Sequence, residues 1–395
     1  MIPNALPAFD FGLGETADMI RDSVAGFAAD KIAPRAGEID ASNQFPRDLW
    51  PQLGDLGVLG VTVEEEYGGA GLGMFEMSLL MEGMSNHGIP MQHLVVGPTM
   101  CLAHIARHGT EEQKRRYLAP ACAGKEVWCF AITEPTAGSN SMKITTLAKT
   151  ADDGDFRLSG QKVFITGSDV AHYAMVVART TPFQDAAKKT DGFTLFIVDL
   201  NAPGVTRRPM DMSIVIPERQ CELFFDDVVL RQADVIGEVD KGFSILFDTL
   251  NPERIILASM LVGLGRYAIT QAVEYASERQ VFDAPIGSYQ GLQHPLAEAK
   301  TEIEVATLMT YKAAWAYDSD RPAAEYSNMA KYYAAEAAIH AVDTAVQCFG
   351  GNAYTHEYGI FDLYPFVRML RTAPLNREML LNYIGEKVLG LPRSY

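Results

Sequence analysis

Two changes in hydrophobic periodicity along the chain constrain its fold more than any other feature. Over residues 15–125, apolar residues recur at steps of three and four, as Ile20 and Val24 do, which predicts helices. Over residues 127–230, short runs rich in β-branched and aromatic residues replace this pattern, and turn residues separate the runs. From residue 241 onward the helical pattern returns and dominates. The sequence therefore predicts helices, then a small β-structure, then a helical bundle.

The same patterns predict where the individual elements lie. The expected strands are the runs at 127–133, 156–166, 173–180, 193–200 and 221–230. Thr110 and Gln113 form a capping-box pattern at the start of an early helix. Later helices are expected at 241–282, 289–318, 323–349 and 376–389. We expect an α+β fold, mostly α, in three domains: an N-terminal helical domain over 1–125, a central small β-barrel or sandwich over 126–235, and a C-terminal four-helix bundle over 236–395.

The composition excludes several classes of protein. The chain has 395 residues, with 33 Lys and Arg against 50 Asp and Glu, which gives a formal net charge of −17. A general nucleic-acid binder needs a basic face, so this balance argues against one. A hydrophobic content of 48% argues against disorder. No continuous apolar run is long enough to predict a membrane-spanning helix.

The N-terminal segment and the cysteines bear on where the protein works. Residues 1–14 have neither the basic region nor the apolar core of a secretory signal, and they lack the Arg residues of a mitochondrial transit peptide. The five cysteines form no CxxC pair, and an odd, scattered set is typical of reduced thiols. We therefore expect a cytoplasmic protein.

Motifs for hydrolysis, nucleotide phosphates and metals are absent from the sequence. There is no HExxH, no GxSxG and no Walker loop, and the eight histidines are scattered. Gly263 and Gly265 lie within a helical pattern, so they do not indicate a dinucleotide-binding loop. We expect neither a hydrolase nor a metalloenzyme.

Polar residues gather instead where two predicted strands end. One strand leads into Thr133 and a loop of small residues that includes Ser139, and another ends on Phe164, Thr166 and Ser168. Such loops can offer backbone N–H groups and hydroxyls to a ligand, and an aromatic ring can stack on a planar one. On pattern alone, an ordinary turn beside a core phenylalanine is the more common explanation.

Four motifs, in order, make the chain closely resemble the acyl-CoA dehydrogenase family. They are FAITEPTAGSN at 130–140, KVFITGS at 162–168, RQVFDAPIGSYQ at 279–290 and QCFGGNAYTHEY at 347–358. The resemblance runs nearly end to end and implies the domain order predicted above. It also implies an FAD cofactor, a CoA thioester substrate, a homotetramer and an electron-transfer flavoprotein as the oxidant.

The resemblance also assigns residues to the cofactor and the substrate. Thr133 resembles the residue that meets the pyrimidine end of the flavin, Thr166 the threonine near flavin N5, and Phe164 the aromatic against the ring system. Ser139 resembles the serine that lines the CoA path beside the cofactor. The remaining implied cofactor contacts lie in the last two motifs and the C-terminal loop: Arg279, Phe282, Gln290, Gln347, Gly350, Gly351 and Asn376.

Arg279 and the two glycines have a physical reason for such a role. In the family, the stretch from Arg279 to Gln290 reaches the FAD of a neighbouring subunit. A guanidinium fork matches phosphate oxygens, and glycine lets backbone come close to a pyrophosphate. Without the resemblance, Arg279 would be interpreted as a surface charge and the glycines as a helix-ending turn.

The implied reaction needs a base, because a carboxylate takes the proton α to the thioester while the β hydride goes to flavin N5. The family places this Glu either in a C-terminal loop, which falls here on Pro374, or on the long helix that reads Asn251-Pro252-Glu253-Arg254. Proline cannot be a base, so the resemblance to the isovaleryl- and long-chain-type branches assigns the role to Glu253. Without it, a Glu beside an Arg on a helix is usually a solvated surface pair. Asn251 and Arg254 are expected to bind the substrate.

Three other carboxylates compete with this assignment. Glu134 and Glu357 lie inside family motifs, and we interpret both as structural. Glu378 flanks the C-terminal loop and stays open as an alternative.

Several residues depart from the family pattern. Pro374 has no N–H, although the family uses the backbone N–H there to polarise the thioester carbonyl. This keeps open a flavoenzyme of the same fold with different chemistry, such as an oxidase, desulfinase or monooxygenase, besides a non-catalytic flavin- or CoA-binding protein. Met91 lies where the glutaryl-type branch places an Arg, which favours a short, medium or branched aliphatic acyl-CoA. Asn140, Gly167 and Asp283 replace the usual Asp, Asn and Gly.

Overall fold

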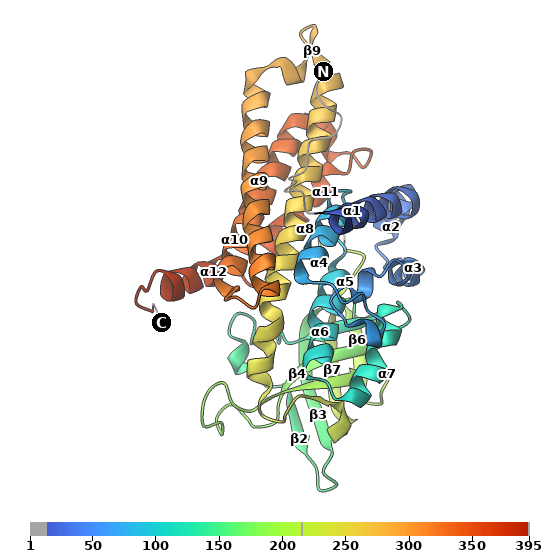
Figure 1. Cartoon of the computed structure of the whole chain (residues 1–395), viewed down its shortest axis with the longest axis vertical. Helices are drawn as coiled ribbons and strands as arrows, with labels where there is room; N and C mark the ends of the chain where they lie inside the picture. The colour runs from blue at the N-terminus through green and yellow to red at the C-terminus, as the bar shows by residue number, and fades with distance from the viewer. Residues whose placement is uncertain (1–13, 215, 394–395) are drawn as a thin grey trace. The chain divides into compact units, whose positions relative to one another are not determined.

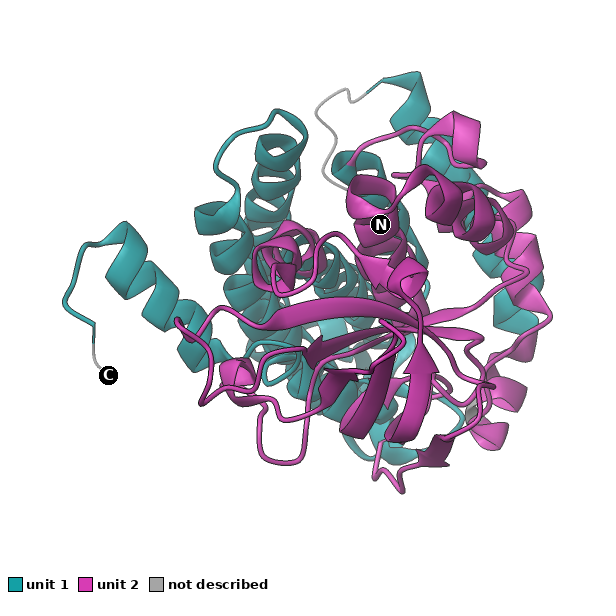
Figure 2. Cartoon of the chain, turned by 90° about the horizontal axis from the view of Figure 1, so that it is seen from below, with its two compact units in different colours: residues 1–34, 74–90, 254–395 teal, residues 35–73, 91–253 magenta. Residues whose placement is uncertain are grey.

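The computed structural model describes residues 14–214 and 216–393, which form two compact units (Figures 1 and 2). Among the described residues, one unit comprises 14–34, 74–90 and 254–393, and the other comprises 35–73, 91–214 and 216–253. Segment 1–13, for which the sequence predicts no targeting signal, lies outside the described residues, as do the ends of the predicted domains at 1–13 and 394–395. The described chain is α+β and mostly helical, as predicted.

The first unit is helical. Its helices are α1 (Glu15–Phe27), α4 (Met74–Ser85), most of α8 (Gly242–Glu278), α9 (Gln290–Asp318), α10 (Ala324–Phe349), α11 (Ile360–Leu370) and α12 (Arg377–Tyr383). Strands β9 (Gln280–Val281) and β10 (Ala284–Pro285) form a hairpin between α8 and α9. Helix α10 packs on α9 and α11, and a Cβ at Gly265 of α8 would meet Ile303 of α9 at 2.3 Å and Ala338 of α10 at 3.5 Å. The C-terminal part is therefore a helical bundle, as predicted, in which α8 to α11 lie side by side and α11 is a helix that the sequence did not predict (Figure 1).

A buried polar cluster ties α4, α8 and α9 together. Arg266 of α8 donates to the Glu82 carboxylate of α4, and both side chains are almost fully buried. The Tyr311 hydroxyl of α9 donates to the second Glu82 oxygen at 2.8 Å, and Arg266 Nη2 lies 3.2 Å from Thr307 Oγ1. Paired charges inside a bundle fix which helix faces which, because each side chain needs its partner nearby.

The second unit is built on an eight-stranded sheet. Its strands are β1 (Trp128–Ala131), β2 (Leu147–Thr150), β3 (Phe156–Thr166), β4 (Tyr173–Arg179), β5 (Phe193–Asp199), β6 (Val205–Pro209), β7 (Gln220–Leu230) and β8 (Val235–Ile236). Their order is β6-β7-β3-β2-β4-β5-β8, and β1 pairs with β4. Strand β4 is parallel to β1, with Trp128 opposite Tyr173, and parallel to β2, whereas the other pairs of this sheet are antiparallel.

The second unit also contains helices. They are α2 (Ala36–Ser42), α3 (Leu49–Asp55), α5 (Gln92–Leu94), α6 (Ala103–His108) and α7 (Glu111–Cys122), with a π-helical segment at Val95–Leu102 that packs on β1. Met100, Ile105 and Leu118 share one buried cluster with Trp128 and Met175 of the sheet. The predicted capping box of α7 is confirmed, because the Gln113 N–H donates to Thr110 Oγ1 at 3.2 Å and the Thr110 N–H donates to Gln113 Oε1 at 2.8 Å.

Five strands and four late helices lie where they are predicted, with bounds that differ by a few residues, and there are three kinds of correction. Strands β2, β6 and β8 were not predicted, because they are short and β6 is an exposed edge. Helix α11 was missed because Gly359 and Pro365 resemble loop punctuation. The predicted helix 241–282 is wrong beyond Glu278, where the hairpin turns through Phe282 and Asp283, both at positive φ.

Among the described residues, one helix, α8, is long and apolar enough to cross a membrane, judged by length and composition alone. Its most apolar window has a mean hydropathy of 1.4, and 83% of that window is buried in the structure. Protein covers these apolar residues, which fits the core helix of a bundle.

The Arg266–Glu82 pair generates the first testable expectation. We expect Arg266→Met to lower the free energy of unfolding by about 3–5 kcal/mol, because it leaves the Glu82 charge buried without its cation. The double variant Arg266→Met, Glu82→Gln removes the charge but keeps an acceptor for Tyr311, and it should recover most of the loss. Urea unfolding of the three proteins measures this. Equal stability of the single variant and the parent would contradict the structural role of the pair.

Candidate active site

The ends of β1 and β3 meet, which brings together the two polar loops singled out from the sequence. The Val163 N–H of β3 donates to the Thr133 carbonyl oxygen at 2.9 Å. Thr133 therefore lies beside the backbone that carries Phe164. Both loops belong to the sheet-containing unit, as do Thr166, Ser139 and Glu253.

A β-bulge aims the Phe164 ring outward. Between Lys162 and Ile165 the pairing of β3 with β7 shifts register, so that one extra residue is accommodated on β3. Phe164 has φ 57°, an unusual conformation for a bulky residue, and its side chain is 54% exposed. Strained backbone of this kind gathers at functional sites. The exposed ring at a strand end suits stacking on a planar ligand better than packing in a core.

Thr166 ends the same strand, with its hydroxyl held in place by a neighbour. Thr166 Oγ1 lies 3.2 Å from Gln220 Oε1, to which it can donate, and 3.1 Å from Gln220 Nε2, from which it can accept. Gln220 is a buried residue of β7. No sequence signal marks Gln220, because a single Gln before an apolar strand resembles an ordinary surface residue.

A buried ion pair lies beneath Thr133. Lys162 Nζ donates to Glu134 Oε1 at 2.9 Å and to the Ile132 carbonyl oxygen at 2.9 Å. Glu134 also accepts the N–H groups of Thr145 at 2.6 Å and Thr146 at 2.9 Å. Glu134 is therefore structural, as predicted from its motif.

The pKa values of this pair follow from burial and from each other's charge. Burial opposes ionisation of Glu134, but the Lys162 charge and the hydrogen bonds it accepts outweigh that effect and hold its pKa at about 2. Burial lowers the pKa of Lys162 to about 8, although the Glu134 charge opposes the shift. The 2.9 Å contact between Lys162 Nζ and Glu134 Oε1 has the geometry of an ion pair.

A buried histidine lies behind the strand end. His93 is fully buried between Phe45 and Trp50, with ring centroids 4.7 and 5.6 Å away, and burial lowers its pKa to about 3. A Cβ at Gly167 would lie 1.9 Å from His93 Nε2. Gly167 has φ 66° and donates its N–H to the Arg219 carbonyl oxygen at 2.7 Å. At the position of Gly167 the family usually has Asn, and His93 fills the space that the Asn side chain would need.

The structure describes both Glu253, the predicted base, and the loop that carries Pro374 at the family's other position for the base. Glu253 of α8 follows Pro252 and is 8% exposed, so it is not the solvated surface residue that its sequence context alone suggests. Pro374 lies in the loop between α11 and α12, after a cis Ala373–Pro374 bond. Buried Lys331 of α10 donates to the Leu370 and Leu375 carbonyl oxygens, each at 2.7 Å, and so holds both ends of that loop.

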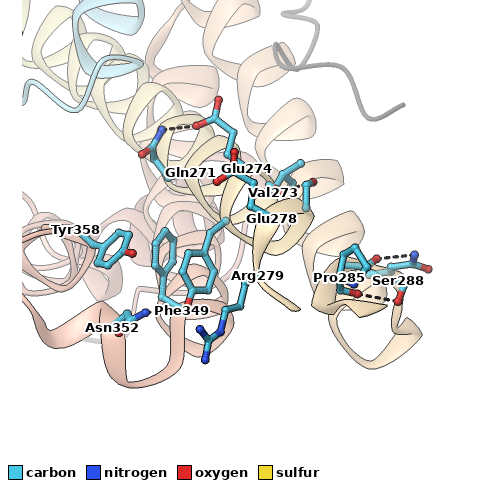
Figure 3. Close-up of a pocket in the computed structure, with 14 residues that line it drawn as sticks. Gln271, Val273, Glu274, Glu278, Arg279, Pro285, Ser288, Phe349, Asn352 and Tyr358 are labelled. Atoms are coloured by element: carbon cyan, nitrogen blue, oxygen red, sulfur yellow. Dashed lines mark hydrogen bonds between the residues drawn. The ribbon is translucent and has the colours of Figure 1, made fainter. Parts of the chain in front are cut away.

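A second group of the predicted cofactor-binding residues lies near a cavity at one end of the helical bundle. A cavity of about 980 Å³ is lined by the end of α8, the hairpin and the loop after α10 (Figure 3). Tyr275 and Phe349 stack there with ring centroids 4.3 Å apart, and Asn352 Nδ2 donates to the Tyr275 hydroxyl at 2.9 Å. Arg279 extends from the end of α8 toward this loop in Figure 3.

The other residues predicted to bind the cofactor do not line the cavity. Phe282 is 88% exposed at the tip of the hairpin. The Asn376 side chain caps α12 by accepting the Met379 N–H at 2.9 Å. Four more lie exposed on the same elements as the lining residues without lining the cavity: Gln290, Gln347, Gly350 and Gly351. Asn352, Phe349 and Tyr275 were missed, although two of them lie inside or beside the QCFGGNAYTHEY motif.

Comparison with known proteins places these features in a family. Sequence profiles of the acyl-CoA dehydrogenase N-terminal, middle and C-terminal domains match residues 14–125, 129–228 and 240–389. The chain belongs to the acyl-CoA dehydrogenase family. It is therefore an oxidoreductase of the acyl-CoA dehydrogenase type.

Individual relatives agree with this placement. The chain is 45% identical over 383 residues to acyl-CoA dehydrogenase FadE12 of Mycobacterium tuberculosis, covering 96% of this chain and 98% of that protein. It is similar to the structure of butyryl-CoA dehydrogenase from Megasphaera elsdenii, with a TM-score of 0.91, 31% identity, and coverage of 96% and 100%. It is also similar to the FAD complex of PigA, with a TM-score of 0.91, 26% identity, and coverage of 97% and 100%.

The residues described above fit the FAD that the family implies. In the sheet-containing unit, Phe164 offers an exposed ring face, and Thr133 and Thr166 offer hydrogen-bonding groups at the adjacent strand ends. In the helical unit, Arg279 and the stacked Tyr275–Phe349 pair line a cavity, which suits the phosphates and base of a nucleotide. Among the described residues, no group of three or more His, Cys, Asp or Glu is placed to hold a metal.

The contact between His93 and Gly167 leads to a prediction. We expect Gly167→Asn to lower the free energy of unfolding by about 1–3 kcal/mol through overpacking, since Asn tolerates the backbone conformation but its Cβ overlaps the imidazole. The double variant Gly167→Asn, His93→Ala should be more stable than Gly167→Asn alone. Gly138→Asn is the matched control, because nothing lies within 4 Å of a Cβ there. Thermal unfolding compares the variants, and a Gly167→Asn protein as stable as the control would refute the packing described.

The Glu134–Lys162 pair predicts a loss of stability in acid. The folded pKa of Glu134, about 2, lies below its ordinary value of 4.5, so its stabilisation is full above pH 4.5 and is lost as the pH falls toward 2. Between pH 6 and pH 3 we expect the parent to lose about 2 kcal/mol more than the Glu134→Gln, Lys162→Met variant. Urea unfolding at both pH values tests this. Parallel losses in the two proteins would mean that Glu134 ionises normally.

Proposed function

We propose that this protein catalyses FAD-dependent α,β-dehydrogenation of an acyl-CoA thioester, with Glu253 as the base that takes the α proton. The observation that carries the proposal is the burial of Glu253, which is 8% exposed on α8, while Pro374 occupies the family's other position for the base. Exclusion of water suits a carboxylate that must accept a proton from carbon. The family match supports the reaction class.

The other residues of the chain bind and orient. Thr133 and Thr166 supply hydrogen-bonding groups toward the flavin, and Phe164 packs against its ring. Arg279 binds the cofactor phosphates as a cation with a planar fork. Ser139, Asn251 and Arg254 hold the CoA arm so that the α carbon stays near Glu253. Bound FAD supplies the hydride acceptor for the β carbon.

The proposal extends to substrate and partners. The acyl group is short, medium or branched, because Met91 stands where a carboxylate-binding Arg would serve a dicarboxylyl substrate. The protein works in the cytoplasm as a homotetramer and passes electrons to an electron-transfer flavoprotein. Pro374, which lacks the N–H expected to polarise the thioester carbonyl, favours an oxidase as the second candidate. Oxygen uptake with acyl-CoA and no flavoprotein acceptor would identify that alternative.

The test is anaerobic reduction of the bound flavin by a panel of straight and branched acyl-CoAs. We expect one chain-length class to bleach the flavin bands, and Glu253→Gln to slow the bleaching by about 100- to 10,000-fold. The matched control is Glu378→Gln, which removes an exposed carboxylate beside the Pro374 loop and should leave the rate near that of the parent. Flavin that stays oxidised with every thioester would refute the proposal. A fast Glu253→Gln protein with a slow Glu378→Gln protein would transfer the role of base to Glu378.

A further inference from the structure

The Gln220 side chain of β7 meets the Thr166 hydroxyl with both ends of its amide. Thr166 ends β3 and lies directly opposite Gln220 in the antiparallel pair, so the two side chains are cross-strand neighbours. Thr166 Oγ1 lies 3.2 Å from Gln220 Oε1 and 3.1 Å from Gln220 Nε2. The first of these amide atoms accepts hydrogen bonds and the second donates them. The hydroxyl can therefore donate or accept at this one side chain by rotating its hydrogen alone.

The surroundings hold the Gln220 amide in this position. The residue is 6% exposed, and its Nε2 lies 3.5 Å from the Glu218 carbonyl oxygen, to which it can donate. A carbonyl oxygen only accepts, so it favours the NH2 end of the amide on that side. The strand end beside it is also fixed, because the Gly167 N–H donates to the Arg219 carbonyl oxygen at 2.7 Å. Both ends of the amide thus face Thr166 from defined places.

The proposed reaction reverses the hydrogen bond that Thr166 makes with the cofactor. This inference rests on the proposed function, in which the Thr166 hydroxyl faces the flavin near N5. In that reaction the α proton goes to Glu253, and a hydride, one hydrogen with two electrons, passes from the β carbon to N5. The thioester is oxidised and the flavin is reduced. Thr166 donates to N5 before the transfer, and afterwards it must accept from the N–H formed there.

A hydroxyl that reverses one hydrogen bond needs a second partner that reverses as well, because it carries a single hydrogen. We propose that Gln220 is a positioning residue that serves as this second partner for Thr166. While Thr166 donates to the flavin, it accepts from Gln220 Nε2. When Thr166 accepts from the flavin, it donates to Gln220 Oε1. The hydroxyl hydrogen is paired in both states, and this arrangement is called the hydrogen-bond switch below.

Loss of the amide affects the two redox states unequally. With oxidised flavin, the Thr166 hydroxyl still donates to N5 and lacks only a donor to one of its lone pairs. With reduced flavin, the hydroxyl hydrogen has lost its acceptor at a place that the cofactor covers. A buried donor without a partner is rarer, and costs more, than an acceptor with a free lone pair. Removing Gln220 should therefore disfavour the reduced form and lower the midpoint potential.

The first experiment measures the midpoint potential of the bound flavin without substrate, by anaerobic reductive titration against a reference dye. Gln220→Met keeps a side chain of similar length but removes the amide. We expect it to favour oxidised flavin about 10-fold relative to the parent, which is about 30 mV for a two-electron couple. Gln220→Asn, whose amide is one carbon shorter and falls short of the hydroxyl, should shift the potential in the same direction. A parent-like potential in both variants would refute the hydrogen-bond switch.

The matched control is Gln161→Met, which removes an amide from the same pair of strands. Gln161 of β3 donates through Nε2 to Glu222 Oε1 of β7 at 3.2 Å, away from the strand end that carries Thr166. Its potential should equal that of the parent. A shift as large as that of Gln220→Met would mean that any lost amide between these strands moves the potential, and it would refute the specific role of Gln220.

The second experiment is a double-mutant cycle that tests whether Gln220 acts through Thr166. Thr166→Val removes the hydroxyl, so adding Gln220→Met to it should change the oxidised-to-reduced ratio by less than about 2-fold. The full shift in this background would refute the switch, because Gln220 would then act on the flavin without the hydroxyl. With acyl-CoA, Gln220→Met should slow flavin reduction about 3-fold and leave the KM near that of the parent.

The outcomes separate this inference from the proposed function, because the potential is measured without a thioester. If an acyl-CoA reduces the flavin and Gln220→Met keeps the potential of the parent, the switch is refuted and the dehydrogenase proposal stands. If no thioester reduces the flavin but the cycle couples Gln220 to Thr166, the switch stands and the dehydrogenase proposal is refuted. If the parent binds no FAD, both are refuted.

Discussion

The buried Lys162–Glu134 pair is the constraint on which the candidate active site depends. Removing two charges from water costs free energy, and good geometry with additional hydrogen bonds offsets that cost. Lys162 belongs to β3, and its bonds to Ile132 and Glu134 hold the segment that leaves β1. Glu134 then holds the backbone that leads into β2 through Thr145 and Thr146. Three separate segments, at 132–134, 145–146 and 162, are therefore held together beside Thr133 by one pair of side chains.

Two backbone conformations build on that fixed frame. The bulge before Ile165 turns Phe164 outward, and the positive φ of Gly167 ends the strand in a tight turn. His93 closes the space behind that turn, so the strand end is backed by solid packing. A flavin ring needs a flat, rigid surface with donors at defined positions, and a bulge alone would leave this surface free to move. The frame, the bulge and the histidine together explain why the strand ends can serve as a cofactor surface.

The sequence predicted the parts of the fold that periodicity and capping encode. The long helices α9 and α10, the five main strands and the α7 capping box follow from spacing alone. The parts it missed depend on contacts between distant residues. Lys162 looks like an exposed position between apolar residues, yet it is fully buried, because its partner Glu134 lies 28 residues away. His93 likewise has no local signal for its place behind Gly167.

The candidate site was predictable to a similar degree. Motifs located Thr133, Phe164, Thr166 and Arg279 on strand or helix ends, where the structure has them. They could not predict that the Tyr275–Phe349 stack would line a cavity with Arg279, because that arrangement requires the end of α8 and the loop after α10 to meet.

Arg179, the last residue of β4, shows how the surface of the loops at 138–143 and 180–192 can change while their backbone stays anchored. Its guanidinium bonds to main-chain oxygens at positions 142, 181, 189 and 191, and every amino acid offers that oxygen. Mutations at these positions can therefore replace the side chains that face solvent without removing the acceptors that anchor the loops. The shape of the loops can therefore be inherited while the chemistry of their surface changes. Selection can then act on the side chains of these loops without first rebuilding the fold.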